Sequence, residues 1–261
     1  MTDGNDAPRI IRPDDPDVPT EIRAMWPQEV PELHVRGPFP MARPAVAIVG
    51  TTTPSPIARG WAYECAREAA RCGWLVVSGM ATGIDRAAHE GALDGGGITA
   101  AVVANGLDRP FPPGSEAFTE RVIATGGSVV SIAPPGTPAT SAGLLLRNRF
   151  TSAFADIVLA VQARGRGGTL ATMRHATRQR KLLATFLPPA QSSLDEWQGN
   201  RALISPDAPW RDRDLVWRPA VALSDPSELP ELFAHWQSLE PVDVPPPVFE
   251  TRPEKQLRLL E

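Results

Sequence analysis

Short apolar runs alternate with helical patterns through the central part of this chain, and this alternation constrains the fold more than any other feature. The runs predict strands at 45–50, 74–78, 98–104, 128–132, 156–162 and 182–187, and the patterns between them predict helices at 57–72, 83–93, 115–124, 141–153 and 169–180. Such an alternation is typical of a parallel sheet covered by helices on both faces. We therefore expect an α/β fold, a Rossmann-like parallel sheet sandwiched by helices, with ligands at the carboxyl ends of the strands.

The flanking segments lack this pattern. Residues 1–42 are acidic and rich in proline, and they predict an extended arm that packs through Ile22, Met25 and Trp26. Beyond residue 189 the chain is rich in tryptophan, and 227–239 predicts a closing helix capped by Ser227. We expect three parts: the arm at 1–42, a Rossmann-like domain at 43–240 and a proline-rich tail at 241–261.

Composition excludes several classes of protein. No apolar run approaches the roughly 18 residues of a membrane span, and the first twenty residues have no signal-peptide pattern. Cys65 and Cys72 stand seven positions apart on a predicted helix, which favours two core residues over a disulfide, and no cysteine spacing suits a metal. We expect a cytoplasmic protein with no membrane contact and no bound metal.

The distribution of charge is uneven. The whole chain has a net charge of −4, whereas residues 43–188 hold 15 basic and 9 acidic residues, a net charge of +6. Residues 147–181 include eight basic residues and a single acidic residue, Asp156. Such a block is either a set of solvated helix faces or a surface that binds a polyanion.

Two strand ends offer backbone groups to a ligand. The first is Gly50-Thr51-Thr52, which lacks the Gly-x-Gly-x-x-Gly pattern of dinucleotide sites, so we expect no cofactor of that kind. The second runs from Ser78-Gly79 to Gly83 and Asp85, a strand, turn and helix start that favours an anion. Asp85 is alternatively a plain helix cap. His89 follows on the same helical face, and without a nucleophile elbow it is better interpreted as a buried structural histidine than as a catalytic one.

Two further strand ends carry arginines. Arg147-Asn148-Arg149 is a compact set of donors for phosphate oxygens or a base edge, although arginines on a helix also pair with carboxylates. Arg164, Arg166, Gly167, Gly168 and Thr169 form a loop that can wrap an anion, or else a tight turn; no Gly-Lys-Ser/Thr follows, so it is not a P-loop. Lys181 closes the same basic block. We assign no catalytic residue.

Several of these motifs, in this order, resemble the bacterial DprA/Smf DNA-processing family. The resemblance rests on Ser78-Gly79-Met80-Ala81-Thr82-Gly83-Ile84-Asp85 with Ala88-His89, on Gly106-Leu107-Asp108, on Pro134-Pro135-Gly136-Thr137-Pro138, on Arg147-Asn148-Arg149 and on Gly168-Thr169-Leu170. It implies an extended Rossmann fold that binds single-stranded DNA in a basic pocket as a homodimer. It also implies that the DNA is handed to the RecA recombinase during natural transformation.

The chain departs from the family pattern at defined positions. The family's Gly-Ser-Arg after the first strand is Gly50-Thr51-Thr52 here, so that arginine's phosphate contact is absent unless Arg59 or Arg166 replaces it. Gln162 stands where an acidic residue is expected. We expect the arm to be too short and too polar for the helical domain that many members carry, and the region after Trp236 to leave little room for their winged helix.

A second hypothesis is a nucleotide-binding sensor or nucleotide-processing enzyme of the related lysine-decarboxylase-like group, for instance in stress or phage defence. Those proteins place a catalytic glutamate shortly after the glycine-rich turn. This chain has Ala171, Thr172 and Met173 there, which disfavours N-glycosidic hydrolysis. The sequence thus favours a DNA-binding mediator over an enzyme.

Overall fold

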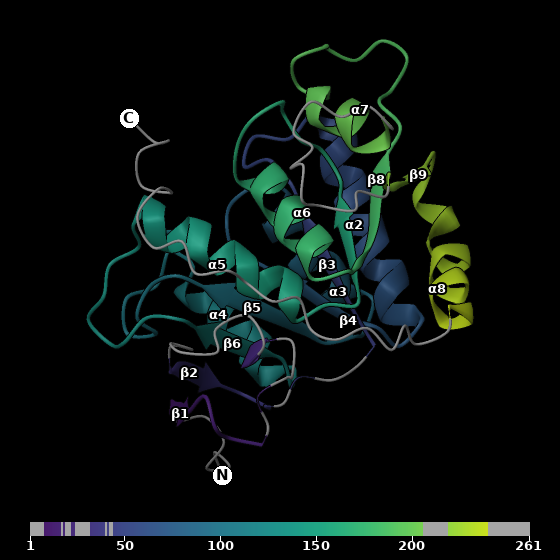
Figure 1. Ribbon diagram of the computed structural model, residues 1–261. Coiled ribbons are helices and arrows are strands. Elements are labelled where there is room, and N and C mark those ends of the chain that lie inside the picture. The colour runs from purple at the N-terminus through teal and green to yellow at the C-terminus, as the bar shows by residue number, and fades with distance from the viewer. Residues whose placement is uncertain are drawn as a thin grey trace.

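The computed structural model describes residues 8–16, 18, 22–23, 32–39, 41, 44–205 and 219–239. Within them one sheet runs in the order β1-β2-β6-β5-β4-β3-β7-β8-β9 (Figure 1). The strands are β1 (Arg9–Ile11), β2 (Leu33–Arg36), β3 (Ala45–Val49), β4 (Leu75–Ser78), β5 (Thr99–Val103), β6 (Ser128–Ser131), β7 (Ile157–Ala160), β8 (Leu182–Phe186) and β9 (Val221–Leu223). The helices are α2 (Pro56–Arg71), α3 (Ile84–Asp94), α4 (Glu116–Ala124), α5 (Ser141–Ala153), α6 (Gly168–Arg178), α7 (Gln198–Ile204) and α8 (Leu229–Ser238).

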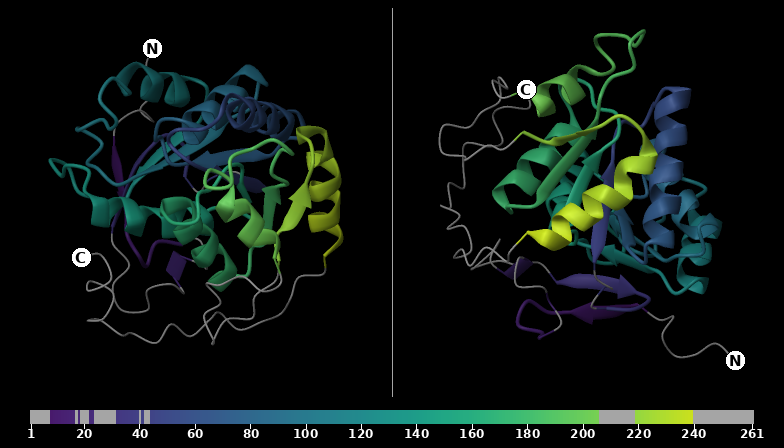
Figure 2. Two further views of the ribbon diagram at one scale, coloured as in Figure 1. Left: turned by 90° about the horizontal axis from the view of Figure 1, so that it is seen from above. Right: turned by 90° about the vertical axis from the view of Figure 1, so that its right-hand side faces the viewer.

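Helices cover both faces of the sheet, as the sequence predicts (Figures 1 and 2). On one face α2, α3 and α8 bury apolar side chains with Val46, Ile48 and Leu159. On the other face α5 and α6 pack against the alternate residues of the same strands, among them Ala47 and Val158. A fully buried parallel sheet needs apolar side chains on both faces, which is why these strands read as continuous apolar runs.

The order of the strands reverses beside β3. The chain adds β4, β5 and β6 on one side of β3, and then returns to place β7 on the other side, where Val46 pairs with Ile157 in parallel register. In open α/β sheets ligands bind outside the carboxyl ends of the strands at such a switch point. The loops after β3 and β7 are therefore the first place to look for a functional site.

Two short strands extend the sheet beyond β6. β2 pairs antiparallel with β6, and β1 pairs antiparallel with β2, at the edge farthest from β9 (Figure 2). The sequence predicts an extended arm here but not its pairing with the sheet. Ile22 is buried as expected, whereas Met25 and Trp26 lie outside the described residues. The division of the chain at 42/43 and 240/241 stays a prediction.

The predicted elements from 45 to 187 are confirmed, with ends that shift by at most two residues. Two expectations need correction. Ser227 does not cap the closing helix: Asp225 accepts a hydrogen bond from the Ser227 backbone N–H and begins a short 3-10 helix before α8. Cys65 is buried, but Cys72, the C-cap residue of α2, is exposed. The elements α7 and β9 were not predicted.

Candidate functional site

The loops after β3 and β7 meet at the switch point. The Thr51 backbone N–H donates to the Gln162 carbonyl at 3.0 Å, and Nη2 of Arg164 lies 3.5 Å from Oγ1 of Thr53. These residues are more than a hundred positions apart in sequence, and only the adjacency of β3 and β7 brings them together. We call residues 51–53 and 164–168, together with Asn148, the switch-point surface.

The turn before α3 packs under the first of these loops. Gly83 has φ +81°, and a Cβ at that position would lie 2.6 Å from the carbonyl oxygen of Thr51. The backbone N–H of Ile84 donates to the same carbonyl at 3.2 Å. Gly50, Thr51, Thr52 and Gly83 thus lie close together, and the hydrogen bond from Ile84 already uses the first N–H of α3.

Two candidate site residues pair in the interior. Nη1 of Arg147 lies 3.8 Å from Oδ2 of Asp85, with the two residues 6% and 7% exposed. The same Nη1 donates to the Val102 carbonyl at 3.2 Å. Burial raises the pKa of Asp85, although Arg147 and the Ala81 N–H act in the opposite direction. The carboxylate pairing that the sequence left open is therefore the arrangement that Arg147 adopts.

The turn after β4 is shaped to receive this arginine. A Cβ on Gly79 would lie 1.3 Å from Nη1 of Arg147, so only glycine leaves room for the guanidinium. Ser78 is fully buried and its hydroxyl donates to the Ile48 carbonyl at 2.7 Å. Asp85 accepts from the Ala81 N–H and does not cap α3, whose N-cap Gly83 has no side chain. Ser78, Gly79, Asp85 and Arg147 form a support beneath the surface.

The N-terminus of α6 faces outward at the switch point. Its N-cap, Gly167, has φ +126° and makes no side-chain cap. Gly168 is exposed, and Nδ2 of Asn148 lies 3.3 Å from its carbonyl oxygen. Free N–H groups and the positive end of a helix dipole favour an anion. Arg164 and Arg166 are exposed beside them and Thr169 is partly buried, so this end of α6 can bind phosphate oxygens.

Two further predicted cations lie elsewhere. Arg149, a residue of α5, lies against the C-terminal end of α6, where its carbonyl accepts a hydrogen bond from Nε2 of Gln179 at 2.9 Å. Burial, and then the charge of Arg178, lowers the pKa of Arg149. Lys181 directly precedes β8, at the amino edge of the parallel strands. The structure does not bring Lys181 to the switch point, because a residue that begins a strand lies at the opposite edge of the sheet from one that ends it.

Two buried amide side chains, those of Asn200 and Gln162, fix the loops of the site by hydrogen bonds. The sequence did not assign them that role. Asn200 accepts from the Ala163 N–H at 2.8 Å, and its Nδ2 lies within 3.3 Å of the Val161 and Phe186 carbonyls and of the Thr185 hydroxyl. Gln162 accepts from the Ser55 N–H at 2.8 Å through Oε1. The first fixes the start of the loop after β7, and the second fixes the start of α2. The Gly199-Asn200 pair in the sequence was the available signal.

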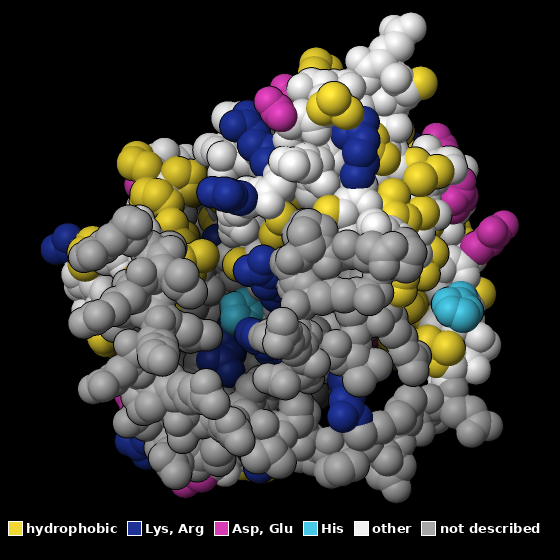
Figure 3. Space-filling view, turned by 45° about the horizontal axis from the view of Figure 1, so that its top comes forward, with side chains coloured by type: hydrophobic (Ala, Val, Ile, Leu, Met, Phe, Trp, Pro, Cys, Tyr) yellow, Lys and Arg dark blue, Asp and Glu magenta, His cyan; other side chains and the backbone are white. Residues whose placement is uncertain are grey.

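Basic and acidic side chains are distributed unevenly over the surface. Figure 3 shows several Lys and Arg side chains in the middle of the face turned forward, and Asp and Glu mostly toward its rim.

Among the described residues no group of three or more His, Cys, Asp or Glu side chains is placed to hold a metal ion. In the same part of the chain, no helix is long and apolar enough to cross a bilayer.

Comparison with known proteins gives one family. Residues 9–214 match the family described as DNA recombination-mediator protein A. Protein Smf of Synechocystis sp. is 33% identical over 65% of this chain and 43% of its own length, and the putative DNA processing protein DprA of Mycobacterium tuberculosis is 35% identical over 67% and 43%. The chain thus spans less than half the length of these relatives.

Solved structures share the fold. DNA processing protein A of Helicobacter pylori superposes with a TM-score of 0.69 and 23% identity, covering 88% of this chain and 97% of that one. A molybdenum cofactor binding protein of Rippkaea orientalis reaches a TM-score of 0.51 at 18% identity, over 76% of this chain and 99% of its own. At these identities the likeness establishes the fold alone.

Proposed function

This chain belongs to the DNA recombination-mediator protein A family, and from that membership we propose that it binds single-stranded DNA at the switch-point surface. The observation that carries the proposal is the uncapped N-terminus of α6, exposed between Arg164, Arg166 and Asn148. The Helicobacter pylori relative is described for its single-stranded DNA binding mode. In this chain the phosphate contacts come from backbone N–H groups and exposed arginines.

A cation from the loop after β7 stands close to the place where the family has an arginine after its first strand. Thr51 and Thr52 occupy the positions after the first strand, and they offer no charge to a phosphate. Arg164 reaches across to Thr53, at the end of the same loop, and supplies a cation there from the neighbouring strand. We propose that Arg164, with Arg166 beside it, replaces the lost contact.

The wider role follows from the family. We propose that the chain acts in DNA uptake and recombination in the cytoplasm, as a homodimer that passes single-stranded DNA to the RecA recombinase. Binding through phosphates carries no sequence information, which suits a protein that must accept any incoming strand.

One titration tests the proposal. Fluorescence anisotropy is measured with a labelled single-stranded oligonucleotide of arbitrary sequence, at low and moderate salt. We expect binding that weakens steeply with salt, because each neutralised phosphate releases counterions. Absence of binding even at low salt would overturn the proposal.

A mononucleotide ligand is the second candidate, because exposed N–H groups at the start of a helix can bind a single phosphate group as well as a strand of them. The same titration with a panel of nucleotides decides between the two. The positions after the glycine-rich turn disfavour a hydrolase: the Thr172 hydroxyl donates to the Gly168 carbonyl at 3.0 Å, and Met173 is buried. Tight binding of a nucleotide together with no affinity for DNA would favour the hypothesis that the protein is a nucleotide sensor.

A further inference from the structure

The first two turns of α5 carry apolar side chains at the surface. Leu144, Leu145 and Leu146 follow one another there; Leu146 is 40% exposed, and the other two are half-buried. The next residue, Arg147, is buried. Three consecutive apolar residues that all remain in contact with solvent are unusual in a folded protein unless they bind something. We call Leu144, Leu145 and Leu146 the leucine wall.

The packing of α5 explains this inverted arrangement. Arg147, Phe150 and Thr151 lie on one side of the helix and are all buried. Among them, Arg147 holds its guanidinium 3.8 Å from the carboxylate of Asp85. Because successive residues of an α-helix are rotated by about 100°, Leu145 lies on the side opposite to these three residues. The interior contacts of Arg147 and Phe150 thus decide how α5 faces, and they leave the leucine wall at the surface.

The leucine wall continues the switch-point surface along α5. Asn148 belongs to that surface, and its Nδ2 lies 3.3 Å from the carbonyl oxygen of Gly168 at the start of α6. Leu144 and Leu145 precede Asn148 by four and three residues, so they lie on the same side of the helix, one turn away. The helices α5 and α6 pack side by side (Figure 1). Figure 3 shows hydrophobic side chains gathered beside the basic side chains of this face. A strand whose phosphates lie at the start of α6 is therefore within reach of the leucine wall.

The bases are the part of such a strand that fits an apolar surface. Leucine side chains offer neither charge nor hydrogen bonds to a phosphate, whereas Arg164 and Arg166 are exposed beside the start of α6 and offer both. The flat faces of bases are apolar, and their contact with apolar side chains removes surface from water. The two chemistries of a single strand thus match the two parts of this face.

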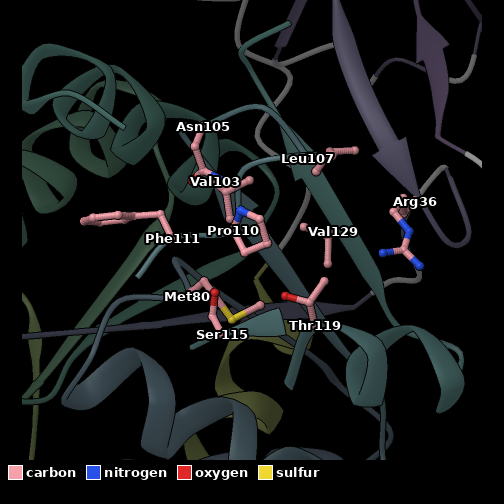
Figure 4. Close-up of a pocket in the computed structure, with 10 residues that line it drawn as sticks. All are labelled: Arg36, Met80, Val103, Asn105, Leu107, Pro110, Phe111, Ser115, Thr119 and Val129. Carbon is pink, nitrogen blue, oxygen red and sulfur yellow. The ribbon is translucent and has the colours of Figure 1, made fainter. Parts of the chain in front are cut away.

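The hollow beside the loop after β5 gives no other place for a base. It is lined by Met80, Val103 and Ser115, among others (Figure 4), and its cavity volume is about 20 Å³. Such a space holds about one water molecule. A bound base therefore lies on the surface of the protein and not in this hollow.

We propose that the leucine wall contacts the bases of the single strand whose phosphates lie on the switch-point surface. The inference rests on the proposed function, and it adds the bases to the parts of the DNA that this chain contacts. Every base has an apolar face, so this contact adds affinity without reading the sequence.

The test compares two labelled single strands of equal length by fluorescence anisotropy. One strand is normal and the other is abasic, with the same phosphates but no bases. We expect the unmodified chain to bind the normal strand more tightly, because only that strand reaches the leucine wall with apolar surface.

Leu144→Gln combined with Leu145→Gln removes the apolar surface that lies beside Asn148. Glutamine has a helix propensity close to that of leucine, so α5 still forms. The double variant should bind the normal strand about three- to ten-fold more weakly, as expected when one or two methylene groups are no longer buried. Its affinity for the abasic strand and its salt dependence should equal those of the unmodified chain, because no phosphate contact is lost.

Leu239→Gln is the matched control. Leu239 is 46% exposed at the end of α8, which covers the opposite face of the sheet from α5. This variant should bind both strands as the unmodified chain does, and circular dichroism should show equal helix content in the two variants.

The outcomes separate this inference from the proposed function. Equal affinity of the unmodified chain for the two strands, or an equal loss for both strands in the double variant, overturns the role of the leucine wall and leaves the proposed function standing. A double variant that keeps its affinity for the normal strand but forms fewer dimers in sedimentation assigns the leucine wall to contacts between copies, and this also overturns the inference. Absence of binding to either strand overturns the proposed function and the inference with it.

Discussion

The guanidinium of Arg147 and the carboxylate of Asp85 lie 3.8 Å apart in the interior, where they join α5 to the turn that opens α3. Each residue comes from a motif that resembles the family's DNA-binding pattern, and neither reaches the surface. Their contribution is to position Asn148, the next residue of α5, against the start of α6. A mutation at Arg147 therefore affects stability first and ligand binding as a consequence.

Arg147→Ala is expected to lower the free energy of unfolding by about 3–5 kcal/mol, because it leaves Asp85 as a buried charge without its partner. Urea denaturation followed by circular dichroism measures this. Arg174→Ala, an exposed arginine on α6, is the control and should change the free energy by no more than about 0.5 kcal/mol. Equal stabilities of the two variants would contradict the role given to the pair.

Arg164→Gln combined with Arg166→Gln is expected to weaken binding of single-stranded DNA and to flatten its salt dependence. Two lost phosphate contacts reduce the slope of log K against log salt by about 1.4. Anisotropy titrations at four salt concentrations give the slope. Lys181→Gln removes one cation from the opposite edge of the sheet, so its slope should equal that of the unmodified protein; a matching reduction there would show that DNA does not bind where we place it.

Gly79→Ala is expected to destabilise the protein by about 1–3 kcal/mol, the usual range for overpacking a filled interior. The new Cβ would lie 1.3 Å from Nη1 of Arg147, so the guanidinium must leave Asp85. Thermal unfolding measures the effect. Gly60→Ala on α2 is the matched control: no atom lies within 4 Å of its Cβ, and the change should stabilise the helix by about 0.5–1 kcal/mol.

His89 makes stability depend on pH. Burial, with the charges of Arg86 and Arg147, lowers the pKa of His89 to about 3, and its Nδ1 lies 2.6 Å from the Thr99 hydroxyl, which donates to the Val76 carbonyl. The unfolded chain takes up a proton near pH 6.5, whereas the folded chain does not. The contribution of His89 to the free energy of unfolding is therefore fully present above about pH 6.5. Below that pH the free energy of unfolding falls by about 1.4 kcal/mol per pH unit, until the pH reaches about 3.

His175 adds a second contribution of the same sign, because burial and then Arg149, Arg178 and Arg174 also lower its pKa to about 3. Urea titrations at pH 7, 6, 5 and 4 measure the slope. His89→Gln should reduce the slope by the contribution of one proton, whatever its effect on stability at pH 7. An unchanged slope would mean that His89 is already protonated in the folded protein.

The strands and helices from 45 to 187 follow from the sequence alone, because apolar periodicity and glycine turns are properties of neighbouring residues. The short strands β1, β2 and β9 could not be found in this way. Each has three or four residues and is defined by its pairing with a distant strand, as between β2 and β6. Cys72 shows the same limit on a smaller scale: its spacing from Cys65 predicts a core residue, but it lies at the C-terminal cap of α2 and is exposed.

The same distinction between local sequence and tertiary packing applies to the candidate site. The sequence by itself determined which loops end the strands, and it identified the glycines at 79, 83 and 167–168 that those loops require. Only the tertiary structure decided that Thr53 and Arg164 meet, since the strand order places β3 beside β7. It also decided that Arg147 points inward to Asp85 while Lys181 lies at the far edge. A sequence pattern records local conformation, whereas the direction of a side chain and the neighbour that it contacts depend on how distant elements pack.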